Sequence, residues 1–114
     1  MIEPEFFISS VNQLLVRFPK EPPMRARLLA HWLIEGMSLD LDLNRTIEQF
    51  ARVEAGEPEI SVGIFTVTSY ISKERVRLEQ AFFPCPEEEA NPASTELSFA
   101  EAKELILRWR DAME

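Results

Sequence analysis

The chain has 114 residues, 46% of them hydrophobic, and a net charge of -8. This length predicts a single domain over residues 1–114, and the eight Phe and two Trp argue against a disordered chain. No apolar run approaches the ~18 residues that a membrane span needs. The acidic balance also makes nucleic acid a poor direct partner, because phosphates need clustered Lys and Arg.

The expected compartment is the cytoplasm. The chain holds one cysteine and cannot form an internal disulfide, which fits a reducing environment. Its first residues, MIEPEFFISS, carry acids where an export signal carries positive charge. We therefore expect a cytoplasmic protein with no membrane partner.

Two helices are predicted first. Residues 4–19 are expected to form one between two prolines, because their apolar residues recur at helical spacing: Phe7, Val11, Leu14, Leu15 and Phe18. A second is expected to start at Pro22–Pro23 and end near Gly36. This second helix is so apolar that we expect it to be central, with Met24, Leu28, His31 and Trp32 on one face.

The segment from residue 38 to residue 59 has a mixed pattern. Leu39, Leu41 and Leu43 alternate with acids, which is the period of a strand, whereas Ile47 and Phe50 follow helical spacing. We expect a short extended piece and then a short helix, with Asn44 available as its N-cap. A strand across residues 46–53 is the alternative.

Residues 60–83 carry the strongest strand signal. Pairing residue 71 with 76, 69 with 78, 67 with 80 and 65 with 82 gives one antiparallel register across the loop SKER. Apolar residues at 60, 62 and 64 have the opposite parity, which predicts a bulge or bend near residues 63–65. A third strand is available from residues 39–43.

A final helix is predicted after residue 98. Ser98 and Glu101 form the S-x-x-E capping box, and an apolar stripe follows: Ala102, Leu105, Ile106, Trp109 and Met113. Residues 84–97 are expected to be a loop that is too short to separate domains. The expected fold is α+β and two-layered, with helices packed on one face of a small antiparallel sheet.

The residues that could carry chemistry are few. Cys85 lies between two prolines, and the three glutamates after it would raise the pKa of its thiol rather than lower it. Cys-Pro pairs also occur in haem-responsive proteins, but we expect an incidental loop cysteine and no cofactor. The stretch DLDLN resembles the start of a calcium loop, yet Arg45 and Ala51 stand where its glycine and closing glutamate belong.

His31 is the only histidine and Cys85 the only cysteine, so a structural zinc site is excluded and no metal is expected. It could act in catalysis only with a nucleophile from a distant part of the chain. With three glycines in the chain, a phosphate-binding loop is also not expected. We therefore expect a protein that is not an enzyme, with His31 in a core or lining a groove.

The negative charge is concentrated in two segments. Residues 38–60 carry six acids and two bases, and residues 84–114 carry eight acids and three bases. The exposed acids expected to meet a basic partner are Glu87, Glu88, Glu89, Asp40 and Asp42. Solubility alone is the competing explanation for this charge.

The arrangement from ISVGIFTVTSYISKERVRLEQAFF to ELSFAEAKELILRW, within residues 60–109, resembles small acidic bacterial immunity proteins. Those proteins pair with toxins of interbacterial competition and show a hairpin, then a helix that starts L-S-x-x-E-A and closes on Trp. The resemblance implies an inhibitor that binds a basic enzyme, and it transfers no functional residue. The alternatives are a small dimeric adaptor or secretion-type chaperone, and an enzyme that uses His31.

The thiol of Cys85 can be tested by substitution. Cys85→Ser should leave the melting temperature and any binding activity nearly unchanged, because an incidental loop thiol makes no essential contact. Thermal melting and absorption spectra after incubation with haem check this. A haem Soret band that disappears on the substitution would show that the thiolate is a ligand.

Overall fold

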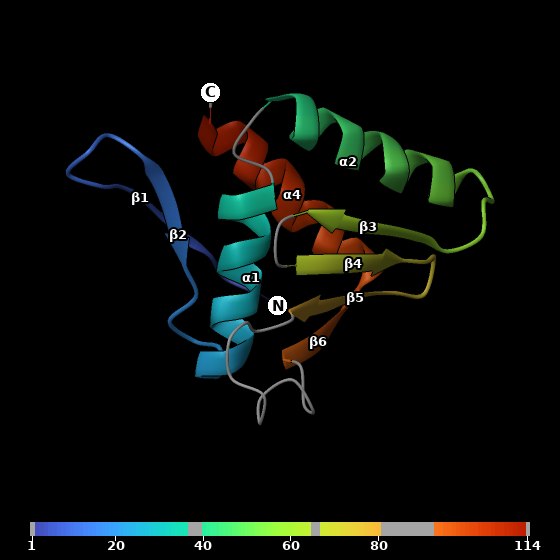
Figure 1. The fold of residues 1–114 in the computed structure, drawn as a ribbon, viewed down its shortest axis with the longest axis horizontal. Coiled ribbons are helices and arrows are strands. Elements are labelled where there is room, and N and C mark those ends of the chain that lie inside the picture. The colour runs from blue at the N-terminus through green and yellow to red at the C-terminus, as the bar shows by residue number, and fades with distance from the viewer. Residues whose placement is uncertain (1, 37–39, 65–66, 81–92, 114) are drawn as a thin grey trace.

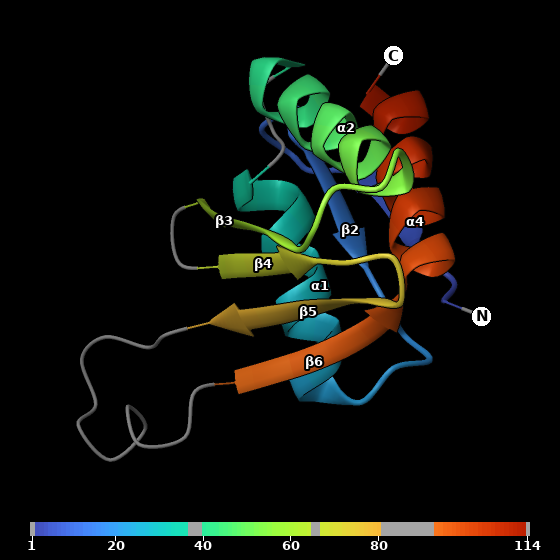
Figure 2. The same cartoon turned by 90° about the vertical axis from the view of Figure 1, so that its right-hand side faces the viewer.

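A computed structural model describes residues 2–36, 40–64, 67–80 and 93–113. Its elements in chain order are β1 (Glu5–Ile8), β2 (Leu14–Arg17), α1 (Pro23–Gly36), α2 (Asp40–Glu54), β3 (Ile60–Ile64), β4 (Val67–Ile71), β5 (Arg75–Gln80), β6 (Ala93–Ser98) and α4 (Phe99–Met113). β1 and β2 form one antiparallel sheet, and β3-β4-β5-β6 form another in that order. Figures 1 and 2 show α1, α2 and α4 on one side of the larger sheet, which confirms the α+β fold.

The predicted central helix is confirmed as α1. Leu28, Leu29 and Leu33 have no exposed surface, and Trp32 is 3% exposed. The helix contacts β2 on one side and β4, β5 and β6 on the other, so it lies between the two sheets (Figure 1). Met24, which was expected on the same buried face, is instead exposed at the start of the helix.

The predicted helix over residues 4–19 is wrong, because this segment forms the β1–β2 hairpin. Asn12 has a φ of 63°, a left-handed conformation that turns the chain and interrupts a helix. The residues that pack inward from β2 and just beyond it, Leu14, Val16 and Phe18, alternate at the period of a strand. The helical spacing of the apolar residues in this segment therefore does not reflect a helix.

The expected extended piece at residues 39–43 is also wrong where the structure describes it. α2 is one continuous helix from Asp40, so Asn44 is not its N-cap, and neither the third strand nor the alternative strand over 46–53 forms. The buried stripe runs back from Val53 and Phe50 to Leu43 at spacings of three and seven. Alternation over so few residues cannot be distinguished from helical period.

The predicted hairpin register is confirmed for three pairs: Ile71 with Val76, Ser69 with Leu78, and Val67 with Gln80. The fourth pair, residues 65 and 82, lies outside the described residues. The expected bulge is wrong, because residues 60–64 form a separate strand that pairs antiparallel with β4. The change of parity thus comes from a second hairpin, and β3 with β6 completes the sheet.

The capping box before α4 is confirmed. Glu101 donates its backbone N–H to Ser98 Oγ at 3.1 Å, and Ser98 donates its backbone N–H to Glu101 Oε1 at 3.4 Å. The predicted loop over residues 84–97 is wrong at its end, because β6 begins at Ala93 and pairs with β5. Cys85 lies outside the described residues.

Trp109 joins the N-terminal hairpin to the rest of the core. It is 1% exposed, and the centroid of its ring lies 6.1 Å from that of Phe6, at an interplanar angle of 50°. Ala102, Leu105 and Ile106 of α4 are buried with it, and Met113 packs against the same core. The predicted apolar stripe is therefore part of the core.

Trp109→Ala should lower the free energy of unfolding by about 3–5 kcal/mol, because it leaves a large cavity between α4 and β1. Chemical denaturation followed by circular dichroism measures this loss. A mutant that unfolds at the wild-type denaturant concentration would contradict the core assignment.

Candidate protein-binding surface

The acidic residues predicted to bind a partner are only partly within the described structure. Asp40 and Asp42 lie in the first turn of α2, where the helix dipole stabilises negative charge. Glu87, Glu88 and Glu89 lie outside the described residues. The structure therefore places Asp42 where its charge stabilises the start of α2.

Most basic side chains are used within the molecule. Ion pairs to neighbouring acids involve Arg17, Lys20, Arg25, Arg52, Arg75, Arg77, Lys103 and Arg110. By contrast, Asp42, Glu48 and Glu59 have no ion pair with another described residue. Because the bases are neutralised locally, the excess negative charge falls on acids of this kind, two of them on α2.

His31 is half-exposed, and its ring contacts two polar groups from α1 and β5. Its Nδ1 lies 3.1 Å from Glu35 Oε1 and 3.1 Å from Gln80 Nε2. The tautomer with Nδ1–H donates to Glu35, and the other tautomer accepts from Gln80. Because Glu35 lies on α1 and Gln80 on β5, the ring joins these two elements.

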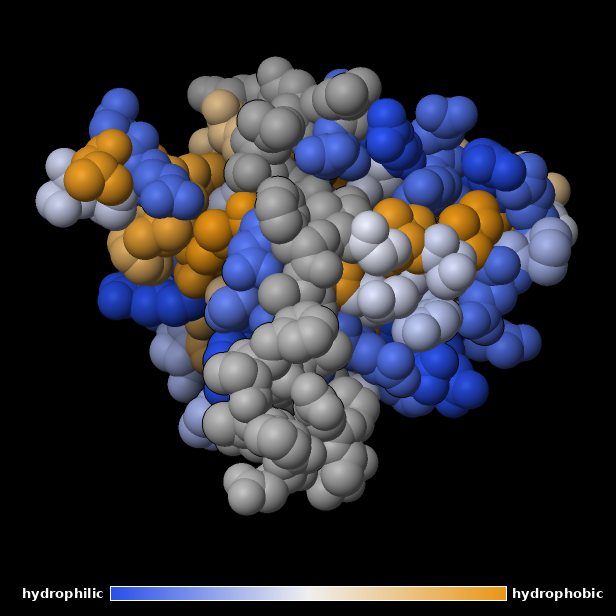
Figure 3. Space-filling view, viewed as in Figure 1, coloured by the Kyte–Doolittle hydropathy of each residue, from blue (hydrophilic) through white to orange (hydrophobic). Residues whose placement is uncertain are grey.

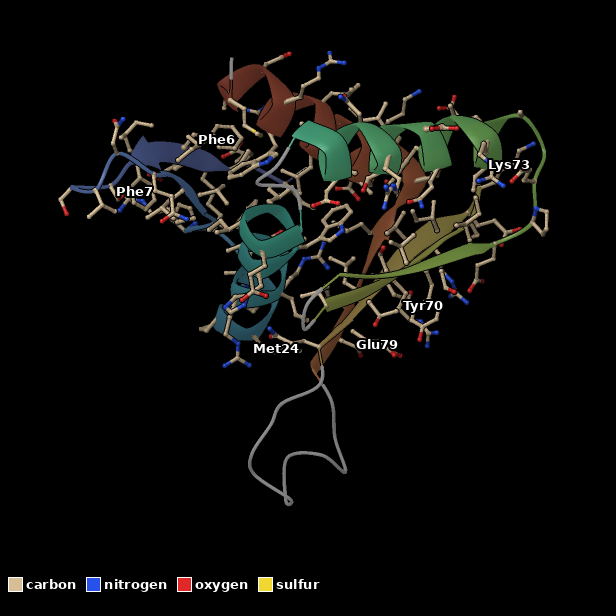
Figure 4. All side chains as sticks on the ribbon, turned by 45° about the horizontal axis from the view of Figure 1, so that its top comes forward. Phe6, Phe7, Met24, Tyr70, Lys73 and Glu79 are labelled. Atoms are coloured by element: carbon tan, nitrogen blue, oxygen red, sulfur yellow. The ribbon has the colours of Figure 1, made fainter. Side chains whose placement is uncertain are left out.

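The charged side chains of β5 lie on the sheet face away from the helices, where Figure 4 labels Tyr70 and Glu79. Arg77 pairs with Glu79 at 3.1 Å, and its guanidinium lies 4.3 Å from the ring centroid of Tyr70. Arg75 pairs with Glu96 of β6 at 3.5 Å. Opposite charges thus compensate each other across this face.

The exposed large hydrophobic side chains of the described residues are concentrated on the β1–β2 hairpin. Phe7 is 37% exposed, Ile8 59% and Val11 77%, and only Met24, at 45%, lies elsewhere. Figure 3 shows hydrophobic residues gathered over this projecting hairpin. We call Phe7, Ile8 and Val11 the hairpin patch.

The hairpin holds its patch outward because its two faces differ. Phe6, paired with the buried Val16, packs against the core, and the next residue, Phe7, points to the other face. Figure 4 shows Phe6 near α4 and Phe7 farther out along the hairpin. Ile8 shares the parity of Phe6 but lies beyond the core and stays exposed.

The tip that carries Val11 is a hydrogen-bonded turn. Asn12 donates its N–H to the carbonyl of Ser9 at 2.9 Å, and Ser9 donates its own N–H to the carbonyl of Gln13 at 2.8 Å. Gln13 N–H also bonds to Ser9 Oγ at 3.1 Å. These bonds fix the backbone at the tip, so the exposure of Val11 belongs to an ordered turn.

Charged side chains surround the base of the hairpin. Arg17 pairs with Glu5 across the strands at 3.2 Å, and its guanidinium lies 5.1 Å from the ring centroid of Phe7. Lys20 donates to Glu3, and this hydrogen bond lowers the pKa of the Glu3 carboxyl and raises that of Lys20. Both pairs are exposed, so they orient the surface more than they stabilise it.

Described residues of α2 and α4 line a small hollow. This hollow, lined by Ile47, Phe50, Lys103, Ile106 and Leu107, has a volume of about 20 Å³, room for about one water. In these ranges no group of His, Cys, Asp and Glu is arranged to hold a metal ion. None of the helices in the described parts of the chain is long and apolar enough to cross a membrane.

Sequence reasoning missed the hairpin patch because it assigned Phe7 and Val11 to the buried stripe of a helix. The signal that could have found it is the short turn SSVNQ between two runs of strand-forming residues.

Comparison with known proteins does not identify a family: no family model, curated protein or solved structure matches the chain.

Val11→Ser should change the free energy of unfolding by no more than about 0.5 kcal/mol, because the side chain is already in solvent. Phe6→Ala is the contrasting variant and should destabilise by about 3 kcal/mol or more, since its ring packs on Trp109. Denaturation curves of the two variants measure the difference. Equal losses would mean that the tip is part of the core.

Proposed function

We propose that this protein is a non-catalytic protein-binding module, an inhibitor of the immunity or antitoxin kind that binds a basic partner enzyme. One observation carries the proposal: of the four large hydrophobic side chains that are exposed among the described residues, three project from a single ordered hairpin. Apolar side chains exposed together on one projecting element are suited to contacts with another protein.

The hairpin patch has the properties of a binding anchor. Its backbone is hydrogen-bonded at the tip and held to the core through Phe6, so little conformational freedom is lost on binding. Aromatic and aliphatic side chains that enter a partner's pocket supply most of the energy of such interfaces. Phe7, Ile8 and Val11 are the side chains available for that role.

The charge of the chain supports a basic partner. A net charge of -8, with most bases already paired locally, attracts a positively charged surface and accelerates its approach. Binding would then combine electrostatic attraction with burial of the hairpin patch. The toxin-inhibitor form of the proposal rests on the resemblance of residues 60–109 to immunity proteins.

A capture experiment tests the hairpin. Tagged wild-type protein should retain a basic protein from the source cells, and Ile8→Asp/Val11→Asp should reduce its retention about tenfold or more, because a buried charge opposes docking. Met24→Asp is the matched control, an exposed hydrophobic residue away from the hairpin. Purified partner should lose its activity on adding wild-type protein but not the hairpin variant. Equal retention by both variants would contradict the proposal.

The acidic residues make a separate kinetic prediction. Changing Glu87, Glu88 and Glu89 to Gln should slow association with that partner and flatten its salt dependence, because screening acts over about 8–10 Å. Asp40→Asn/Asp42→Asn tests the other acidic segment in the same assay. Association rates from stopped flow at several salt concentrations measure both. If neither set changes the rate, the charge serves solubility.

A further inference from the structure

The four-stranded sheet has two edges, β3 and β6. A free edge exposes backbone N–H and C=O groups that can pair with another chain, so proteins usually cover it or place charges and prolines in it. In this protein the two edges are treated differently.

The direction of the backbone groups follows from the β4–β5 turn. Ser72 donates its N–H to the carbonyl of Arg75 at 3.0 Å, so the backbone groups of Ser72 point toward β5. These groups alternate in direction along a strand. The backbone N–H and C=O groups of Ile71 and Ser69 therefore point toward β3.

The same alternation fixes the direction within β3. Ile60 pairs with Ile71 and Val62 with Ser69, so Ile60 and Val62 direct their backbone groups into the sheet. Ser61 lies between these two residues and Gly63 follows them. Both therefore direct their backbone N–H and C=O groups to the free edge. Both residues are exposed.

The β6 edge is occupied by groups from two helices. Arg25 of α1 donates to the Glu96 carbonyl at 2.9 Å and to Thr95 Oγ1 at 3.1 Å. Glu101 of α4 accepts from the backbone N–H of Ser98 at 3.4 Å. These contacts block the addition of a strand beside β6.

The β3 edge has no comparable hydrogen-bonding partners within the described parts of the chain. No described side chain or backbone group bonds to the outward N–H or C=O of Ser61 or Gly63. Residues 60–72 contain no charged residue and no proline. Figure 3 shows a band of weakly polar and apolar residues over β3 and β4, beneath the hydrophilic residues of α2.

We propose that the β3 edge binds an extended, basic segment of an unlike protein as a fifth strand, through the backbone of Ser61 and Gly63. Main-chain hydrogen bonds would supply affinity, and alternating side chains would supply specificity. This names the partner's segment and so rests on the proposed function, while using a surface separate from the hairpin patch.

Charge decides between an unlike partner and a second copy. Glu59 precedes β3, and α2, with Asp42 and Glu48, lies beside the edge in both Figures 1 and 2. A second copy paired through the same edge would bring the same acids and another net charge of -8. A segment with lysine or arginine at its ends would instead be attracted there.

A short acetylated peptide of alternating valine and threonine between terminal lysines is the probe. In ¹⁵N–¹H spectra of the full chain, it should shift the amide signals of Ser61 and Gly63. Ser61→Pro removes only an outward N–H and should weaken binding about tenfold. Ser94→Pro, an outward-facing serine of the opposite edge, is the matched control and should bind normally.

Two further measurements do not depend on whether the Ser61→Pro variant folds. The same peptide with alternate backbone nitrogens methylated should not bind wild-type protein, because it lacks the pairing donors. Glu59→Lys should weaken binding of the lysine peptide, whereas Glu104→Lys, on α4, should not. Glutamate in place of the peptide's lysines should also weaken binding.

Several results would overturn the proposal. These are no amide shift at about millimolar peptide, equal binding by Ser61→Pro and wild type, or shifts confined to the hairpin patch. A concentration-dependent dimer in sedimentation that Ser61→Pro abolishes would assign the edge to a second copy. Ile8→Asp/Val11→Asp should bind the peptide normally, so the edge and the hairpin can fail separately.

Discussion

The packing of α1 between the two sheets is the contact on which the rest of the structure depends. Leu28, Leu29 and Leu33 are completely buried, and the helix contacts β2 on one side and the larger sheet on the other. An isolated two-stranded hairpin is marginal in water. The N-terminal hairpin therefore holds its shape because α1 and Trp109 supply the apolar surface that it lacks alone.

This arrangement leaves each surface with a distinct character. The helices cover one face of the four-stranded sheet, and opposite charges compensate each other on the other face, as Arg77 and Glu79 do. Arg25 ties α1 to β6 and closes that edge. Among the described residues, an apolar hairpin at one end of the molecule and the uncharged edge of β3 remain exposed, and the proposed contacts with other chains use these two surfaces.

Most of the candidate binding surface could not be predicted from the sequence. Asp40 and Asp42 were recognised as acidic, but their position in the first turn of α2 follows from a helix that the alternating leucines concealed. The hairpin patch was missed because exposure depends on where the core ends. Ile8 has the inward parity of Phe6, yet it is 59% exposed, since the hairpin extends past the residues that could cover it. Periodicity reports a side chain's direction and not its neighbours.

The sequence by itself determined the elements whose signals are local and strong. The apolar run after Pro23, the capping box of Ser98 with Glu101 and the alternation across residues 67–80 each specified an element, because hydrogen bonding and side-chain direction within a few residues suffice. Tertiary structure decided the rest. Residues 5–17 are compatible with both helical spacing and strand alternation, and packing against α1 and Trp109 stabilises the hairpin. The same holds for β3 and β6, whose places as open and closed edges depend on partners distant in the chain.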